Sequence, residues 1–283
     1  MRKIIKLIIA CLFCFNASAE TAKIFISKVV NHPALDATTS GIIDELKDAG
    51  FENKKNIDLR VESAQGNVAT AMQIASKFVS MGADISVGIG TTSAQSFVKY
   101  AKNKETILIF SSVTDPIGSG LVQSIENPSN NISGVSNFVP LEPQIELFQK
   151  IQPNLKSLGI LYNPGESNSV SLVKKLELVC KEYGIKLITQ VATKTSEIPQ
   201  ATHNLVKKVD AIFISNDNTA LSALGNIIDI ANKSFIPVYV SDTDAVELGA
   251  VAALGPNQYE VGKQTGRMII AILNGENISN IPV

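Results

Sequence analysis

The chain has 283 residues, of which 45% are hydrophobic and 18% charged, and its formal net charge is −1. This balance is typical of a folded chain with one large domain or two ordinary ones, and it excludes a disordered protein. The near-neutral charge also excludes the strongly basic surface on which nucleic-acid binding depends, so nucleic acid is not an expected partner.

The first 19 residues have the pattern of a signal peptide. A basic start precedes an apolar core from Leu7 to Phe15, which is too short to span a membrane. Ala17-Ser18-Ala19 fits the small-residue cleavage pattern, so we expect a soluble periplasmic protein whose mature chain begins at Glu20. In an alternative interpretation Cys11 is the lipid-attachment site of a lipoprotein, but this would leave a much shorter apolar core.

The cysteines support the same compartment. Cleavage would remove Cys11 and Cys14 and leave Cys180 alone, so no internal disulfide is expected in an oxidising environment. Cys180 falls on the apolar face of a predicted helix and is interpreted as a small core residue.

Strand and helix patterns alternate along the rest of the chain. The first series has predicted strands at Ile24–Val30, Ile57–Val61, Ile85–Ile89 and Ile107–Val113, with helices at Leu35–Ala49, Val68–Met81 and Ser93–Ala101. The second has strands at Leu158–Tyr162, Ile185–Val191, Ala211–Ser215 and Pro237–Val240, with helices at Ser167–Tyr183, Ile198–Val206 and Thr219–Ala231. A short strand, Ala250–Leu254, and a helix, Tyr259–Leu273, follow. Such alternation predicts parallel sheets covered by helices on both faces.

The two series resemble each other, because Asp84–Pro116 and Asp210–Ala245 both read as strand, polar turn, helix, strand and Asp-containing turn. We therefore predict an α/β protein with two Rossmann-like lobes, whose parallel sheets are joined by a hinge with a ligand cleft between them. The first lobe is predicted to contain residues 20–137 and 256–276, and the second residues 138–255 and 277–283. The Asn-, Ser- and Pro-rich stretch from Glu126 to Pro143 is the predicted first crossing between the lobes.

Polar turns follow most of the predicted strands. In open parallel sheets ligands bind beyond the carboxyl ends of the strands, so two facing lobes would place these turns around one cleft. The candidate ligand-binding residues are His32, Thr91, Thr92, Ser93, Asp115, Glu166, Ser167, Asn168, Asp217, Asn218 and Asp242. Several of them also have a purely structural interpretation, because Ser, Thr, Asn and Asp commonly cap helix N-termini.

The chemistry of these turns suits a small zwitterion such as an amino acid. Hydroxyl and amide donors at the helix starts, at residues 91–93 and 167–169, would bind a carboxylate. Asp217 and Asp242, with Glu166 as a third candidate, would accept the hydrogens of an ammonium group. The turns contain no Lys or Arg, which disfavours phosphate esters and dicarboxylates.

Signatures of catalysis and of cofactor binding are absent from the sequence. There is no G-x-x-x-x-G-K phosphate loop and no G-x-S-x-G nucleophile motif, and Gly88-Ile89-Gly90 lacks the third glycine of a dinucleotide fingerprint because Ser93 stands there. The two histidines, His32 and His203, are far apart in sequence, which argues against a histidine-rich metal site. We therefore predict a binding protein rather than an enzyme, without a cofactor or a metal.

Six short segments carry a resemblance to one known family. They are His32–Asp36 (HPALD), Thr114–Pro116 (TDP), Tyr162–Ser169 (YNPGESNS), Asn216–Thr219 (NDNT), Ser241–Asp244 (SDTD) and Gly262–Gly266 (GKQTG). In this order and spacing they resemble the ABC-transporter substrate-binding proteins of the tryptophan and tyrosine type. The resemblance runs from Lys23 to the end at Val283, where relatives usually continue, so we expect a short member of the family or a truncated one.

The resemblance implies a two-lobed periplasmic-binding-protein fold. It also implies a receptor that closes around a small ligand, in some relatives an aromatic amino acid, and delivers it to an ABC permease in the membrane. The cleft-facing positions of the family map to Thr91–Ser93, Asp115, Glu166–Asn168, Asp217–Asn218 and Asp242. We expect a monomer. Two alternatives remain: a receptor module that presents its ligand to a membrane sensor, and a binding protein for a sugar or another small molecule.

Overall fold

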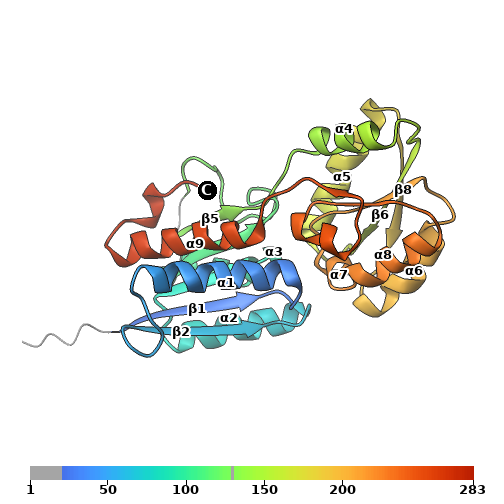
Figure 1. The fold of residues 1–283 in the computed structure, drawn as a ribbon. Coiled ribbons are helices and arrows are strands. Elements are labelled where there is room, and N and C mark those ends of the chain that lie inside the picture. The colour runs from blue at the N-terminus through green and yellow to red at the C-terminus, as the bar shows by residue number, and fades with distance from the viewer. Residues whose placement is uncertain (1–20, 129–130) are drawn as a thin grey trace, which may run out of the picture.

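The chain folds into two lobes, and each is built around a five-stranded sheet (Figure 1). The structure is a computed structural model in which residues 21–128 and 131–283 are described, and the predicted signal peptide lies outside these ranges. The strand order is β2-β1-β3-β4-β5 in the first sheet and β10-β9-β8-β6-β7 in the second. Neighbouring strands run parallel in both sheets. The predicted α/β class with two Rossmann-like lobes is thus confirmed.

The first lobe is a three-layered sandwich. Its strands are β1 (Ala22–Lys28), β2 (Ile57–Ser63), β3 (Ile85–Ile89), β4 (Ile107–Val113) and β5 (Ile132–Ser136), and its helices are α1 (Pro33–Asp48), α2 (Val68–Ser80), α3 (Thr91–Lys102) and α9 (Gln258–Leu273). Successive side chains of a strand point to opposite faces. Ile24 and Ile26 therefore pack toward α1 and α9, whereas Phe25 packs toward α2 and α3.

The second lobe repeats this arrangement. Its strands are β6 (Ser157–Tyr162), β7 (Lys186–Val191), β8 (Ala211–Ile214), β9 (Val238–Val240) and β10 (Ala252–Ala253). Its helices are α4 (Leu141–Ile151), α5 (Ser167–Glu182), α6 (Ile198–Leu205), α7 (Asn218–Leu221) and α8 (Leu224–Lys233), with 3₁₀ turns η1 (Thr195–Glu197) and η2 (Thr243–Leu248). In β8, Ile212 and Ile214 pack toward α6 and α8, and Phe213 packs toward α4 and α5.

Three elements differ from the sequence prediction. The stretch predicted as a crossing contains the edge strand β5, and the following helix α4 is not among the predicted helix ranges. The helix predicted over Thr219–Ala231 is divided into α7 and α8, because the backbone turns at Ser222 and Ala223. The Ser222 hydroxyl donates to the Asn218 carbonyl at 2.7 Å, and such back-bonding competes with regular helix geometry.

The last helix returns to the first lobe and lies against α1 (Figure 1). Glycines make this close approach possible: a Cβ at Gly262 would lie 2.1 Å from the Thr38 carbonyl oxygen, and one at Gly41 would lie 2.1 Å from that of Tyr259. Thr265 sits between the two glycines of the GKQTG segment and its hydroxyl lies 2.7 Å from that of Ser111 on β4. This segment therefore serves helix packing.

The end of the chain corrects one predicted boundary. Residues 277–283 were assigned to the second lobe, but Ile278, in the 3₁₀ turn η3 (Ile278–Asn280), is buried in the core of the first. The Val283 amide also donates to the Ile125 carbonyl at 3.0 Å. The cause is the chain direction after α9, which leads back along β5.

Within residues 21–128 and 131–283, no helix is long and apolar enough to cross a membrane. Cys180 is 1% exposed in the core of the second lobe, and burial raises the pKa of its thiol to about 12, which matches a core residue rather than a reactive thiol.

Candidate ligand-binding cleft

Two adjoining cavities lie between the lobes at the carboxyl ends of the strands. The outer cavity has a volume of about 510 Å³ and the inner cavity one of about 20 Å³. His32, Ala34, Leu221 and Asp242 line both of them, so the cavities share a wall. The inner cavity has room for a group about the size of a water molecule, and the outer cavity is in the size range of small-molecule sites.

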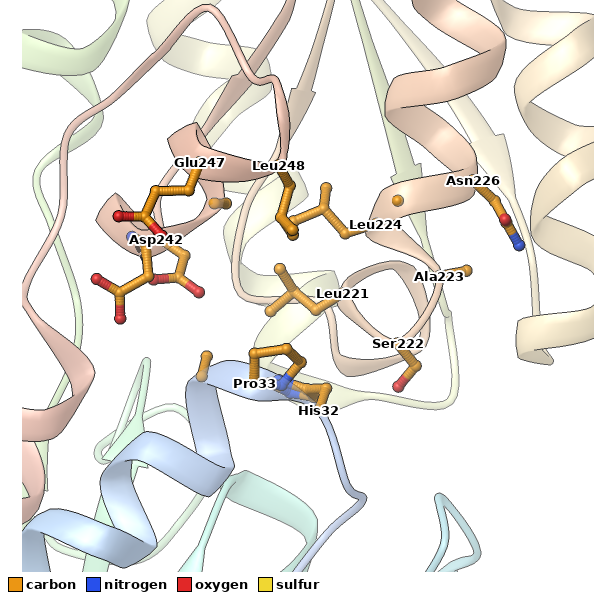
Figure 2. A pocket seen from close by; sticks show the side chains of 14 residues that line it. His32, Pro33, Leu221, Ser222, Ala223, Leu224, Asn226, Asp242, Glu247 and Leu248 are labelled. Carbon is orange, nitrogen blue, oxygen red and sulfur yellow. Dashed lines mark hydrogen bonds between the residues drawn. The ribbon is translucent and has the colours of Figure 1, made fainter.

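The outer cavity is largely aliphatic with acidic groups on one side. Figure 2 shows His32 and Pro33, at the start of α1, facing Leu221, and Leu224 and Leu248 lie beyond it. Asp242 and Glu247 lie together at one side of this apolar surface (Figure 2). Among the described residues that line this cavity there is no aromatic ring other than the His32 imidazole and no Lys or Arg side chain.

The inner cavity is mostly polar and receives side chains from both lobes. Those from the first lobe are His32, Ala34, Leu35, Thr91, Ser112, Thr114, Asn137 and Gln258, and those from the second are Asn168, Asn216, Asn218, Leu221 and Asp242. No Lys or Arg is among them. A ligand that reached this cavity would therefore meet hydroxyl and amide groups and one carboxylate.

His32 connects the two lobes through a buried hydrogen bond. Its Nε2 lies 3.3 Å from Asn218 Oδ1, and Asn218 Nδ2 donates to Glu166 Oε2 at 2.6 Å. Glu166 thereby fixes the Asn218 amide with its oxygen toward His32, which assigns the hydrogen to Nε2 of the imidazole. Burial lowers the pKa of His32, although the hydrogen bond to Asn218 opposes this. A neutral His32 therefore donates across the cleft.

Glu166 is held entirely by its own lobe. Its Oε1 accepts from the amide and hydroxyl of Thr219 at 3.1 and 2.9 Å, and its Oε2 accepts from the amide and side chain of Asn218 at 3.0 and 2.6 Å. It lines a third cavity of about 330 Å³, together with Thr92 and Asn218, but not the inner or outer one. Glu166 thus orients the Asn218 side chain without lining the inner or the outer cavity itself.

Asp217 lies close by and lines neither the inner nor the outer cavity. Its Oδ1 accepts from the Ala220 amide at 2.7 Å, as an N-cap of α7, and its Oδ2 accepts from the Asn163 amide and the Ser169 hydroxyl, both at 2.6 Å. Burial and the charge of Glu166 raise the pKa of this carboxyl. The structure therefore places this predicted ammonium ligand in the framework of the second lobe.

Asp242 differs, because it faces both cavities. It is 7% exposed, and its Oδ1 accepts from the Asp244 amide at 3.2 Å. Among the described residues no basic side chain forms a salt bridge with it. Burial raises the pKa of this carboxyl. An ionised Asp242 would be stabilised by a cation in the cavity, since a buried charge is costly unless it is paired.

The three predicted donors at the start of α3 have separate places. Thr91 is 1% exposed and lines the inner cavity, whereas Thr92 lines the third cavity. Ser93 is fully buried behind them, with its hydroxyl 3.3 Å from that of Ser27. The N-cap residue Gly90 has no side chain to satisfy the first amides, so the helix start can attract an anion.

The two predicted donors at the start of α5 are also separated. Asn168 is 3% exposed and lines the inner cavity, and its Nδ2 donates to the Asn216 carbonyl at 2.7 Å. Its Oδ1 is buried without a hydrogen-bond partner among the described residues. Ser167 is exposed and lines none of the three cavities. The structure thus presents Asn168 as an acceptor, where the sequence predicted a donor.

Asp115 forms a second connection between the lobes, outside the two cavities. Its Oδ2 accepts from the Ser171 hydroxyl at 2.6 Å and from Lys175 Nζ at 3.1 Å, both on α5. The Lys175 ammonium also lies 4.9 Å from the centroid of the Phe138 ring. Burial opposes ionisation of Asp115, but the bonds from Ser171, Gly118 and Lys175 outweigh it and lower the pKa.

Sequence reasoning did not select five of the polar residues of the inner cavity. They are Ser112, Thr114, Asn137, Asn216 and Gln258. Thr114 and Asn216 lie in the TDP and NDNT segments that the sequence already marked, and Ser112 lies one residue before the end of the predicted strand Ile107–Val113. Their position at a strand end was the available signal. Asn137 was hidden in the predicted crossing. Gln258 is the first residue of α9, and only the tertiary fold brings it to the cleft.

The family of the chain follows from comparisons with known proteins. Residues 23–283 match the family model described as ABC transporter substrate binding protein. The chain belongs to this family. The tyrosine-binding protein of Clostridioides difficile is 34% identical over 276 residues, which cover 95% of this chain and 79% of that protein. The resemblance drawn from the six segments is thus confirmed, and with it the assignment as an extracytoplasmic solute-binding protein rather than an enzyme.

Two solved structures show how the lobes are arranged. An ABC domain from Streptococcus pneumoniae in complex with L-Trp is 32% identical, with a TM-score of 0.86. The ligand-free, open structure of a substrate binding protein with adhesive properties from Clostridium difficile is 37% identical, with a TM-score of 0.68. Both comparisons cover 93% of this chain and 88% of the other. This chain is therefore more similar in overall structure to the complex with L-Trp than to the ligand-free, open structure, although the latter is more identical in sequence.

Proposed function

We propose that this substrate-binding protein is a periplasmic receptor for an aromatic amino acid, which it binds by closure of the two lobes and delivers to an ABC permease. The observation that carries the proposal is Asp242, a buried carboxylate that faces both cavities and has no basic partner among the described residues. A ligand ammonium group at the shared wall would provide the missing positive charge.

The apolar outer cavity supports a ligand with a large hydrophobic side chain. Leu221, Leu224 and Leu248 would contact such a side chain while the amino-acid head group lies near Asp242. The relatives point in the same direction, because one is a tyrosine-binding protein and another is in complex with L-Trp. The contacts between the lobes at His32 and at Asp115 are the ones that closure would form.

The test is a binding panel on the mature protein after unfolding and refolding to remove any co-purified ligand. The chain contains no Trp, so the fluorescence of added L-Trp reports its binding directly. We expect L-Trp or L-Tyr to raise the melting temperature, since a ligand at a hundred times its Kd adds about 2.7 kcal/mol to the free energy of unfolding. L-Leu, myo-inositol and arabinose are the comparison ligands. A shift with a sugar and with none of the amino acids would overturn the proposal.

A further inference from the structure

Phe235 lies just after α8, at a position where other helices of this protein have glycine. Its φ is 57°, its amide donates to the Asn232 carbonyl at 3.0 Å, and the Ile236 amide donates to the Ala231 carbonyl at 2.9 Å. These two bonds form a Schellman motif, which requires a left-handed residue and favours glycine. Helices α1, α2, α5 and α9 end with the same pair of bonds, and their left-handed residues are Gly50, Gly82, Gly184 and Gly275. A bulky residue with such a φ is strained.

No packing within the described part of the chain compensates this strain. The Phe235 side chain is 93% exposed. The corresponding left-handed residue after α3 is Lys104, with a φ of 60°, and its charged side chain is well suited to an exposed turn. An aromatic ring left in water is unfavourable. Phe235 is therefore both strained and exposed, which indicates a contact with a partner outside the chain.

Exposed lysines lie beside Phe235 along one edge of the second sheet. The strands β9, β8, β6 and β7 are neighbours in this order, and because they run parallel their first residues meet at this edge. Phe235 precedes β9, and the lysines that precede or begin the other strands, or end α8, are Lys156, Lys186, Lys207, Lys208 and Lys233. We call these five lysines the basic edge. All are exposed, and none forms a salt bridge among the described residues.

The basic edge is positive although the whole chain has a formal net charge of −1. The acid that precedes β8, Asp210, already accepts from the amides of Lys156 and Ser157 at 3.0 and 2.8 Å. The corresponding edge of the first lobe differs, because Lys55 forms a salt bridge with Glu52 there. The second lobe thus presents positive charge beside an exposed aromatic ring, and this combination complements a negatively charged surface.

We propose that the basic edge binds reversibly to the anionic headgroups of a lipid bilayer, with the Phe235 ring inserted among them. Lysines near an anionic membrane surface and aromatic rings at its boundary hold proteins there without a spanning segment. The basic edge lies at the amino ends of the strands, whereas the ligand cavities lie at their carboxyl ends. The membrane-bound protein therefore keeps its cleft accessible, whichever ligand the cleft binds.

Co-sedimentation of the mature protein with lipid vesicles tests this proposal. We expect binding to vesicles of phosphatidylglycerol and phosphatidylcholine in equal parts, much weaker binding to pure phosphatidylcholine, and a decrease with added salt. Phe235→Gly should weaken vesicle binding by roughly tenfold, because the insertion of the ring is lost. It should not lower the melting temperature, because glycine fits the left-handed turn. Lys104→Gly, in the same turn of the first lobe, is the matched control and should leave vesicle binding unchanged.

A second pair of variants tests the charges. Lys207→Gln combined with Lys208→Gln should weaken vesicle binding by roughly twentyfold, since each lysine near an anionic surface contributes a factor of about five. Lys102→Gln combined with Lys104→Gln, at exposed lysines of the first lobe, should have no effect. None of these residues lines a ligand cavity, so the affinity for L-Trp should stay unchanged.

The outcomes that would overturn the proposal are distinct. Equal binding of the wild type to both kinds of vesicle would exclude the anionic headgroups as the partner. Wild-type binding by Phe235→Gly or by the variant at residues 207 and 208 would exclude the basic edge as the contact. A dimer in solution that Phe235→Gly dissociates would make a second copy of the chain the partner in place of the membrane.

Discussion

The buried acids of the second lobe fall into two groups that use their oxygens differently. Glu166 and Asp217 are 7% and 4% exposed, and all four of their carboxylate oxygens accept hydrogen bonds within that lobe. Asp242 is equally buried, but it accepts one bond and faces two cavities. Burial of a carboxylate near a cleft therefore does not identify a ligand contact. We therefore propose that the ligand contacts the acid whose hydrogen-bonding capacity remains free toward the cavity, Asp242.

The largest effect is expected for Asp217→Ala. The amides of Asn163 and Ala220 and the hydroxyl of Ser169 would lose their acceptor in a buried place. We expect the free energy of unfolding to fall by about 3–5 kcal/mol, measured by denaturant titration of the ligand-free protein. Asp229→Ala, at an exposed acid on α8, should change it little. Unchanged stability together with lost binding of L-Trp would instead make Asp217 the partner of the ligand ammonium.

Asp242→Asn should have the opposite signature. The asparagine Oδ1 can still accept from the Asp244 amide, so we expect the fold to keep its stability. The affinity for L-Trp should fall by roughly ten- to a hundredfold, because the charge that faces the ligand ammonium is lost. Fluorescence titration of L-Trp at neutral pH measures this change. Retained affinity would place the ammonium group elsewhere.

The pH dependence of L-Trp affinity should differ between the wild type and Asp242→Asn. Burial raises the pKa of Asp242 in the ligand-free protein, and a bound ammonium would favour its ionised form. At a pH below this raised pKa, binding of L-Trp to the wild type should therefore release a proton from Asp242. The affinity for L-Trp should then fall as the pH drops through the pKa and stay constant at higher pH. Asp242→Asn should lack this component. The stability of the ligand-free protein should depend on pH in the opposite direction. The contribution of Asp242 to the free energy of unfolding decreases as the pH rises from 3.8 through the raised pKa.

The architecture of the lobes was largely readable from the sequence, because parallel strands buried on both faces leave continuous apolar runs. Ile85–Ile89 and Ile107–Val113 were predicted with their observed bounds. The edge strand Ile132–Ser136 was not, since Ser133, Gly134 and Ser136 interrupt its apolar residues. The membership of residues 277–283 also depends on where α9 ends in space, which no local pattern encodes.

The site was less predictable, for a physical reason. Sequence indicates which polar residues follow a strand, but an N-cap and a ligand contact require the same residue types. Thr91 and Asn168 reach the inner cavity, whereas Ser93 and Ser167, in the same turns, do not. One residue along a helix start changes the direction of the side chain by about 100°, so turn position alone cannot separate them.

Asp115→Asn tests a third use of an acid, a contact between the lobes outside the ligand cavities. Asp115 is 18% exposed at its side chain and Lys175 46%, so the ion pair is partly solvated and we expect it to contribute about 0.5–1 kcal/mol. Since this contact favours closure, its loss should weaken L-Trp binding about two- to fivefold without a change in the ligand-free fold. Stopped-flow fluorescence should show the change mainly as faster dissociation of L-Trp.

Lys175→Met shows which part of this contact acts on closure. The variant removes the charge that faces Asp115 but retains an apolar chain beside the Phe138 ring. If the ion pair stabilises the closed state, combining both substitutions should weaken binding less than the sum of the single effects. The effect of either substitution should also shrink at high salt, because exposed charges are screened. Equal dissociation rates for wild type and Asp115→Asn would mean that closure depends on the ligand and the His32 contact, and that Asp115 only orders the turn through its bond from the Gly118 amide at 2.9 Å.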